Sequence, residues 1–163
     1  MARNSCLGMD GRINLVRPRQ IFQHYFLPIR WNQMIKQIGN TLIRNYHRAS
    51  CHCGAVVLEI YLPEGVPAPS YCDCSFCKRK GAIGAAIASS SLRIIQGEEW
   101  LTTYKFGGEI AEHFFCRNCG IHTHHRRSNN PAEFGFNVGC LEAVNPFDLE
   151  NVPIEDGGPW QNP

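Results

Sequence analysis

Seven of the nine cysteines in this 163-residue chain lie in three tight groups, and no other feature constrains the fold as strongly. The groups are Cys51-His52-Cys53-Gly54, Cys72-Asp73-Cys74-Ser75-Phe76-Cys77 and Cys116-Arg117-Asn118-Cys119-Gly120. Cysteines at such short spacing do not easily bridge to each other, and no secretory signal indicates an oxidising compartment, so a disulfide framework is disfavoured. Clustered thiolates are ligands for tetrahedral zinc, whose bonds of about 2.3 Å bring the sulfur atoms to roughly 3.8 Å from one another. The pattern therefore predicts zinc.

Each Cys-x-Cys pair has to lie on a turn, because alternate residues of a flat strand are about 6.8 Å apart, too far for two sulfur ligands of one ion. Gly54 and Gly120 directly follow candidate ligand cysteines, Cys53 and Cys119. Glycine readily adopts the positive φ that such turns use. We therefore expect a left-handed backbone conformation at both glycines.

Counting ligands divides these cysteines into a set of four and a set of three. The first and last groups together supply enough thiolates to close a tetrahedral structural site. These are Cys51, Cys53, Cys116 and Cys119. The middle group supplies three thiolates and leaves one position for water or substrate, as catalytic zinc sites do. These are Cys72, Cys74 and Cys77.

Two other arrangements use the same residues. The middle group could take a fourth protein ligand and become a second closed site. The candidates are His52, Asp73, His122, His124 and His125. Alternatively, Cys72 and Cys77 could join Cys116 and Cys119. Of the two remaining cysteines, Cys140 follows a strand pattern and is expected to be buried, and Cys6 is expected to be an exposed thiol without a role.

Two polar segments near the cysteines are candidates for substrate contact. If the segment from Ile121 to Arg127 alternates as a regular strand, His122 and His124 share one face, and Thr123 and His125 share the other. These histidines could line the open zinc position, bind a carboxylate or simply pack. The run Lys78-Arg79-Lys80 could steer an anionic ligand to the metal or remain solvated.

The residues after 48 predict a mainly β fold. Short apolar or alternating runs are separated by glycine and proline, and strong helical periodicity is missing. The expected strands lie at Ala55–Leu62, Gly81–Ser90, Leu92–Ile95, Leu101–Phe106, Glu109–Phe115, Ile121–His125 and Glu133–Cys140. Gly107-Gly108 predicts a hairpin turn, and the proline-rich tail predicts a loop.

Charge divides the chain into a basic arm, residues 1–48, and an acidic body, residues 49–163. The arm holds eight Lys or Arg and one acidic residue, Asp10, whereas the body holds eight basic and thirteen acidic residues. The arm could be an organelle-targeting segment, a surface element, or an extension preceding a true start at Met34. Residues 29–44 could form a short helix, because Ile35, Ile38 and Leu42 recur at helical spacing. No apolar window is long enough to cross a membrane.

The order and separation of the three cysteine groups resemble the glutathione-dependent formaldehyde-activating enzyme family, which also includes centromere protein V. The stretches Ile121-His122-Thr123-His124-His125 and Asn137-Val138-Gly139-Cys140-Leu141 are also similar to members of this family. The resemblance covers residues from about His47 to Val152 and leaves out the arm. It implies a β-tent fold of mainly antiparallel strands with two zinc ions per chain.

The resemblance also implies residue roles and a reaction. Cys51, Cys53, Cys116 and Cys119 would hold a structural zinc, and Cys72, Cys74 and Cys77 would hold a catalytic zinc. The family reaction adds glutathione to formaldehyde to give S-hydroxymethylglutathione, so the resemblance implies a carbon–sulfur lyase with glutathione as its expected co-substrate. From the chemistry, a histidine or Lys78 could protonate the alkoxide, and Lys78, Arg79 and Lys80 could contact the glutathione carboxylates.

A second hypothesis is a non-catalytic zinc-stabilised module that binds a protein or nucleic acid. The small net charge of +2 gives no field that favours nucleic acid, so small-molecule thiol and aldehyde partners are expected and a membrane partner is not. Clustered free thiols favour a reducing compartment, hence a cytoplasmic location unless the arm targets an organelle.

Overall fold

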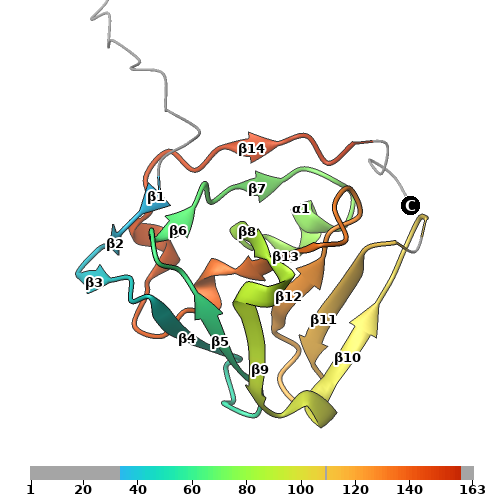
Figure 1. Ribbon diagram of the computed structural model, residues 1–163. Coiled ribbons are helices and arrows are strands. Elements are labelled where there is room, and N and C mark those ends of the chain that lie inside the picture. The colour runs from blue at the N-terminus through green and yellow to red at the C-terminus, as the bar shows by residue number, and fades with distance from the viewer. Residues whose placement is uncertain (1–33, 109, 159–163) are drawn as a thin grey trace, which may run out of the picture.

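The computed structural model describes residues 34–108 and 110–158 (Figure 1). These residues form short strands with a single α-helix, α1 (Cys77–Lys80), among them. The predicted mainly β fold is confirmed. The first 33 residues, which include Cys6 and most of the basic arm, lie outside the described residues, so the hypotheses about that segment stay predictions.

Two larger sheets form the body of the molecule (Figure 1). The five-stranded sheet contains, in spatial order, β10 (Leu101–Tyr104), β11 (Glu112–Cys116), β12 (His122–Arg126), β13 (Glu133–Asn137) and β8 (Gly84–Ala88). The three-stranded sheet contains β4 (Tyr46–Ser50), β5 (Val57–Tyr61) and β9 (Leu92–Gln96). Neighbouring strands in both sheets are antiparallel. Short connections explain this for β4–β5 and for β10–β11–β12–β13, because parallel neighbours need long crossovers, whereas β5–β9 and β13–β8 pair strands that are distant in the sequence.

Smaller pairs of strands complete the fold. They are β1 (Met34–Ile35) with β6 (Val66–Pro67), β2 (Gln37–Ile38) with β3 (Thr41–Leu42), and β7 (Tyr71–Cys72) with β14 (Ile154–Glu155). The first two pairs are antiparallel and the last is parallel. Single 3-10 turns occupy Ser89–Ser91, Glu98–Trp100, Val138–Cys140 and Pro146–Asp148.

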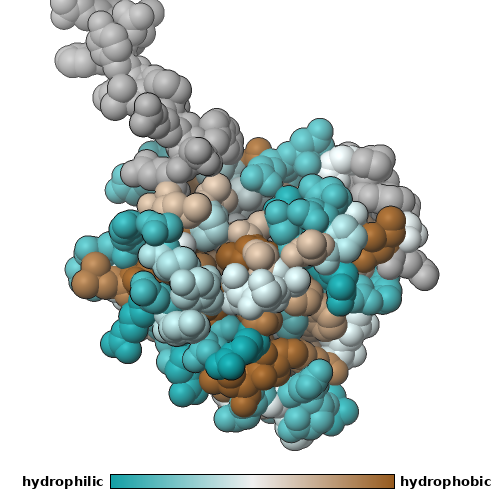
Figure 2. Space-filling view, viewed as in Figure 1, coloured by the Kyte–Doolittle hydropathy of each residue, from teal (hydrophilic) through white to brown (hydrophobic). Residues whose placement is uncertain are grey.

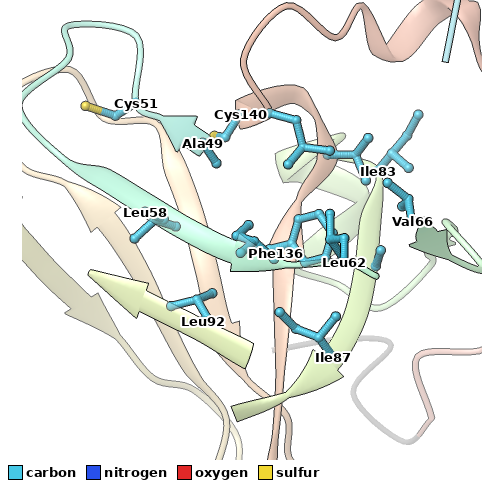
Figure 3. Close-up of a cluster of buried hydrophobic side chains, with 14 of the residues drawn as sticks. Ala49, Cys51, Leu58, Leu62, Val66, Ile83, Ile87, Leu92, Phe136 and Cys140 are labelled. Atoms are coloured by element: carbon cyan, nitrogen blue, oxygen red, sulfur yellow. The ribbon is translucent and has the colours of Figure 1, made fainter. Parts of the chain in front are cut away.

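The hydrophobic core draws side chains from both larger sheets (Figure 3). Leu58 on β5 and Leu92 on β9 belong to the same buried cluster as Ile87 on β8 and Phe136 on β13. Alternation along β5 explains the choice of residues, because Leu58 and Ile60 are buried whereas Glu59 between them is only half-buried. Each fully buried side chain of this kind stabilises the fold by about 1.5–3 kcal/mol. The core therefore holds the two sheets together and fixes the turns at their ends.

The predicted strands after residue 50 are confirmed in place, but their bounds differ: β5, β8 and β10 are shorter than predicted, whereas β9, β11 and β12 each end one residue later. Gly107-Gly108 leads from β10 to its antiparallel partner β11, as expected of a hairpin. The stretch predicted as one strand from Glu133 to Cys140 instead ends at Asn137 and continues as a 3-10 turn. The Asn137 side chain accepts a hydrogen bond from the Gly139 N–H, which stabilises that turn.

Two predictions, one for residues 34–44 and one for the C-terminal tail, are wrong for the described residues. Residues 34–44 form three short strands rather than a helix, because Gly39 has a φ of +54° and turns β2 back onto β3. The tail is not only a loop, because β14 pairs with β7 beside Cys72. The proposed division after residue 48 falls inside β4, and Ile38 is buried in the core, so the described part of the arm packs with the body.

The face of the molecule in Figure 2 is mostly polar, with some apolar side chains. Figure 2 shows a brown patch over the region of β5 and β9 among mostly teal and pale side chains. Tyr61 and Ile95 are exposed apolar residues on these two strands. Within residues 34–108 and 110–158, no helix is long and apolar enough to span a bilayer.

Candidate functional site

Four cysteines from two distant turns meet at one end of the two sheets. Cys51 and Cys53 lie in the turn after β4, and Cys116 and Cys119 lie at the end of β11 and in the turn that follows it. The Sγ atoms of Cys51 and Cys53 are 3.6 Å apart, and those of Cys53 and Cys116 are 3.7 Å apart. These distances match the roughly 3.8 Å expected between thiolate ligands of tetrahedral zinc. The arrangement could hold a metal ion.

The glycines in these turns have the predicted conformation. Gly54 and Gly120 both have a φ of +74°, and a Cβ atom added at either one would meet no atom within 4 Å. Backbone conformation, and not crowding, therefore requires glycine at both positions. Each glycine N–H donates back into its cysteine turn, Gly54 to the Cys51 carbonyl at 3.0 Å and Gly120 to the Cys116 carbonyl at 2.7 Å.

Hydrogen-bond donors also face the sulfur atoms of this four-cysteine group. The Val56 N–H donates to Cys51 Sγ at 3.2 Å, and the Asn118 side-chain amide donates to Cys53 Sγ at 3.3 Å. Hydrogen bonds, first from the Ala55 backbone and then from Asn118, lower the pKa of Cys53 to about 6. Burial raises the pKa of Cys51 to about 11. A cation among the four sulfur atoms would offset the cost of keeping the buried members ionised.

Cys72, Cys74 and Cys77 form a second convergent group. They lie at the end of β7, in the following turn and at the first residue of α1. The Cys77 N–H donates to Cys74 Sγ at 3.3 Å. The hydrogen bond between the side chains of Cys72 and Cys77 is the main reason that the pKa of Cys72 falls to about 6 and that of Cys77 rises. The pair thus favours a thiolate at Cys72.

The C-terminal segment packs against this three-cysteine group. The sequence did not predict this contact. The Gly157 N–H donates to the Asp73 carboxylate at 2.7 Å. A Cβ atom on Gly157 would lie 2.4 Å from the Cβ of Cys74, so only glycine permits this approach. The pair Gly157-Gly158 was the available signal, because adjacent glycines indicate a turn or a close backbone contact.

A cavity of about 480 Å³ opens beside the three-cysteine group. Its lining includes Cys72, Cys74, Cys77, Lys80, His113 and His125. Further charged groups come from Arg127, Glu155 and Asp156. The volume lies within the range of roughly 300–1,000 Å³ that is typical of small-molecule sites. The structure therefore places three thiols, a lysine and two imidazoles around one ligand-sized space.

The three basic residues predicted to contact an anionic ligand do not share one environment. Lys80 is half-buried and lines the cavity, and burial lowers the pKa of its ammonium group. Lys78 and Arg79 are exposed and are not part of the lining. The Arg79 guanidinium donates to the Ser75 carbonyl within the same turn.

The histidine segment departs from the predicted alternation. Residue pairing between β11 and β12 shifts by one at Thr123, so that Phe114 pairs with His124 but Phe115 pairs with His122. This β-bulge brings His122 and His125 to one face, together with His113, the direct partner of His125. The prediction that His122 and His124 share a face is wrong, because a bulge adds one residue to the period-two pattern.

The remaining sequence candidates are placed as follows. His124 stacks against Phe114 on the other face of the sheet, with ring centroids 4.5 Å apart, and His52 is exposed. Within the described part of the chain, no fourth ligand converges on the three-cysteine group of Cys72, Cys74 and Cys77. Cys140 is buried, as predicted.

Comparisons with known proteins agree with this geometry. The family model for glutathione-dependent formaldehyde-activating enzyme matches residues 46–152. This range contains all seven clustered cysteines and both larger sheets. A crystal structure of a protein from Rhodobacter sphaeroides is similar, with 53% sequence identity and a TM-score of 0.64. The match covers 66% of this chain and 99% of that one.

Proposed function

The chain belongs to the glutathione-dependent formaldehyde-activating enzyme family, and from this we propose that it is a zinc-dependent carbon–sulfur lyase that forms or cleaves S-hydroxymethylglutathione. The observation that carries the proposal is the contrast between the two cysteine groups. One group has four convergent sulfur atoms at a turn, and the other has three sulfur atoms at the wall of a cavity. A closed set is typical of structural zinc, and a set of three is typical of catalytic zinc.

The chemistry of the donor sets fits this metal. Sulfur–sulfur distances of 3.6 and 3.7 Å in the four-cysteine group match tetrahedral thiolate coordination. The three-cysteine group offers sulfur ligands of the same kind, within 4.8 Å of one another. When bound there, zinc supplies a position at which a substrate thiol stays deprotonated near neutral pH.

The cavity residues supply charges that suit glutathione, a tripeptide with two carboxylates and one ammonium group. Arg127 can pair with a carboxylate, and Glu155 and Asp156 can pair with an ammonium group. A cavity of about 480 Å³ accommodates a ligand of this class. We assign carboxylate recognition to Arg127 and not to exposed Lys78 and Arg79.

The addition needs one proton to leave the thiol and another to reach oxygen. The sulfur forms a bond to the carbonyl carbon, the carbon–oxygen π bond breaks, and the resulting alkoxide takes up a proton. Lys80 is the cationic donor beside the three cysteines, and its lowered pKa makes proton release easier than from an exposed lysine. We therefore assign proton delivery to Lys80, in place of Lys78.

Exchange between glutathione and formaldehyde, followed by NMR with the zinc-loaded chain, tests the proposal. Because the uncatalysed reaction is a necessary background, Cys74→Ser and Cys140→Ser form a matched pair of variants. Cys140 is a buried cysteine outside both convergent groups. We expect acceleration with wild type and Cys140→Ser, and loss of it with Cys74→Ser. No acceleration by wild type with zinc bound would instead favour the zinc-stabilised binding module.

A further inference from the structure

Three histidines form a third cluster of metal-ligand type, next to the cavity. His113 comes from β11, and His122 and His125 come from β12. Ring centroids are 5.7 Å apart for His113 and His122, 5.1 Å for His113 and His125, and 5.6 Å for His122 and His125. One nitrogen from each ring lies within 4.8 Å of the others. The cluster shares no residue with either cysteine group.

The nitrogens of this cluster lack the partners that buried polar atoms normally have. Nδ1 of His113, Nδ1 and Nε2 of His122, and Nδ1 of His125 are buried, and each lacks a hydrogen-bond partner among the described residues. A neutral imidazole carries one donor and one acceptor, and leaving either unmade in the interior costs about 1–3 kcal/mol. All three rings carry at least one such nitrogen, and one nitrogen from each ring lies within 4.8 Å of the others. Together these observations point to an occupant that contacts all three rings at once.

The local fold makes space for this convergence. Gly135 on β13 is the direct partner of His125. A Cβ atom at Gly135 would lie 2.2 Å from Cε1 and 2.5 Å from Nε2 of the His125 ring. The bulge at Thr123 brings His122 to the same side. The glycine and the bulge together bring the three imidazole rings into one small volume, and the bulge does so by interrupting the regular pairing of β11 and β12.

The chemistry of the cluster selects a metal cation. Burial, together with the charge of Lys80, lowers the pKa of His113 to about 4 and lowers those of His122 and His125 as well. Neutral rings keep a lone pair for a metal and carry no charge to attract an anion. The Lys80 ammonium group opposes a second cation nearby, but the charges of Cys72, Cys74 and Cys77 offset that of Lys80 when these cysteines are ionised. Imidazole ligands suit zinc, copper, nickel and iron, and three of them form a known zinc set with an open position.

We propose that His113, His122 and His125 form a third metal site that binds a divalent transition-metal ion such as Zn²⁺, separate from both cysteine groups. Because His113 and His125 also line the cavity, this ion would lie at the wall of the space that holds the three cysteines. Three protein ligands leave one tetrahedral position for water or a cavity ligand.

Metal content of the full-length, tag-free chain tests the site. The protein is loaded with Zn²⁺, freed of weakly bound ions by gel filtration, and analysed by mass spectrometry for zinc per chain. We expect His122→Phe to hold one ion fewer than wild type. The matched control is His124→Phe, which changes a buried histidine on the same strand but on the other face of the sheet. It should hold the wild-type number.

Cobalt spectroscopy distinguishes this site from the cysteine groups. The Co²⁺ ion missing from His122→Phe should contribute ligand-field absorption without thiolate charge-transfer bands. Equal metal content in wild type and His122→Phe, or a missing ion with thiolate bands, would overturn the proposal. If water molecules and not a metal ion occupy the histidine cluster, wild type and His122→Phe will have equal metal content.

A second variant decides the matter if His122→Phe does not fold. Gly135→Ala leaves all three histidines in place but forces the His125 ring to move. We expect it to weaken binding of the additional ion by about tenfold or more, the loss produced by about 1.4 kcal/mol. Wild-type affinity in Gly135→Ala would count against the site.

Discussion

Lys78, Arg79 and Lys80 are neighbours in the sequence but have different surroundings in α1. Consecutive residues of a helix are rotated by about 100°, so positions two apart point in nearly opposite directions. Lys80 lines the cavity, whereas Lys78 is exposed. A run of three basic residues therefore contributes one cation to the site, and its composition alone does not identify which one.

Replacing Lys80 separates two roles for its ammonium group. If Lys80 delivers the proton to oxygen, Lys80→Met lowers kcat for glutathione–formaldehyde addition by about 100-fold and changes KM little. If it only binds a carboxylate, KM rises and kcat stays. Steady-state kinetics at varied glutathione concentration distinguish the two. Lys78→Met is the matched control and should have the smaller effect. Equal effects of the two variants would contradict the assignment to Lys80.

At the scale of elements, an ion-pair network links three neighbouring segments of the five-stranded sheet. Glu112 on β11 contacts the Lys105 ammonium at 2.6 Å and the Arg126 guanidinium on β12 at 3.0 Å. The hydrogen bond from Lys105 is the main reason that the pKa of Glu112 lies below its ordinary value. The network sits on the strands that carry His113 and His125 and ties their ends together.

The lowered pKa of Glu112 predicts how its contribution depends on pH. Because the folded state has the lower pKa, the contribution is present above the unfolded pKa near 4.5 and is lost as pH falls through the folded pKa. We expect Glu112→Gln to lower the free energy of unfolding at pH 7 by less than about 1 kcal/mol, since the pair is near the surface. Urea unfolding of both proteins at pH 7 and at pH 3 measures this difference. Both proteins lose bound metal in acid, so this loss does not affect the difference between their unfolding free energies. If the unfolding free energies of wild type and Glu112→Gln still differ at pH 3, the ionised Glu112 carboxylate is not the cause of the difference.

For the molecule as a whole, the four-cysteine group joins parts of the chain that are far apart in the sequence. Cys53 and Cys116 are 63 positions apart, yet their sulfur atoms are 3.7 Å apart. One pair of cysteines lies in the turn between β4 and β5 of the three-stranded sheet, and the other lies at the end of β11 of the five-stranded sheet and in the turn after it. An ion held there would tie the two sheets together at one end, in addition to the hydrophobic core between them.

The two cysteine groups should therefore respond differently to the same substitution. Cys116 is fully buried in the four-cysteine group, and structural zinc contributes its binding free energy to folding. We expect Cys116→Ser to lower the free energy of unfolding by several kcal/mol, on the order of 3–5 for an uncompensated buried site. Cys74→Ser should leave the thermal transition close to that of wild type. Calorimetry of the zinc-loaded proteins tests this, and equal destabilisation would refute the division of roles.

The sequence by itself determined the mainly β class, the positions of most strands after residue 50, the two cysteine groups and the positive φ of Gly54 and Gly120. These follow from local spacing, because hydrophobic alternation, turn residues and ligand count are properties of short segments. Only the tertiary structure decided that Lys80 faces the cavity, that Gly157 packs on Cys74 and that His113, His122 and His125 converge. Each of these depends on a contact between distant segments or on a one-residue shift in strand register. Local patterns do not specify these contacts: adjacent glycines at 157 and 158 indicate a close approach but not its partner, and the register shift that gathers the histidines arises from strand pairing.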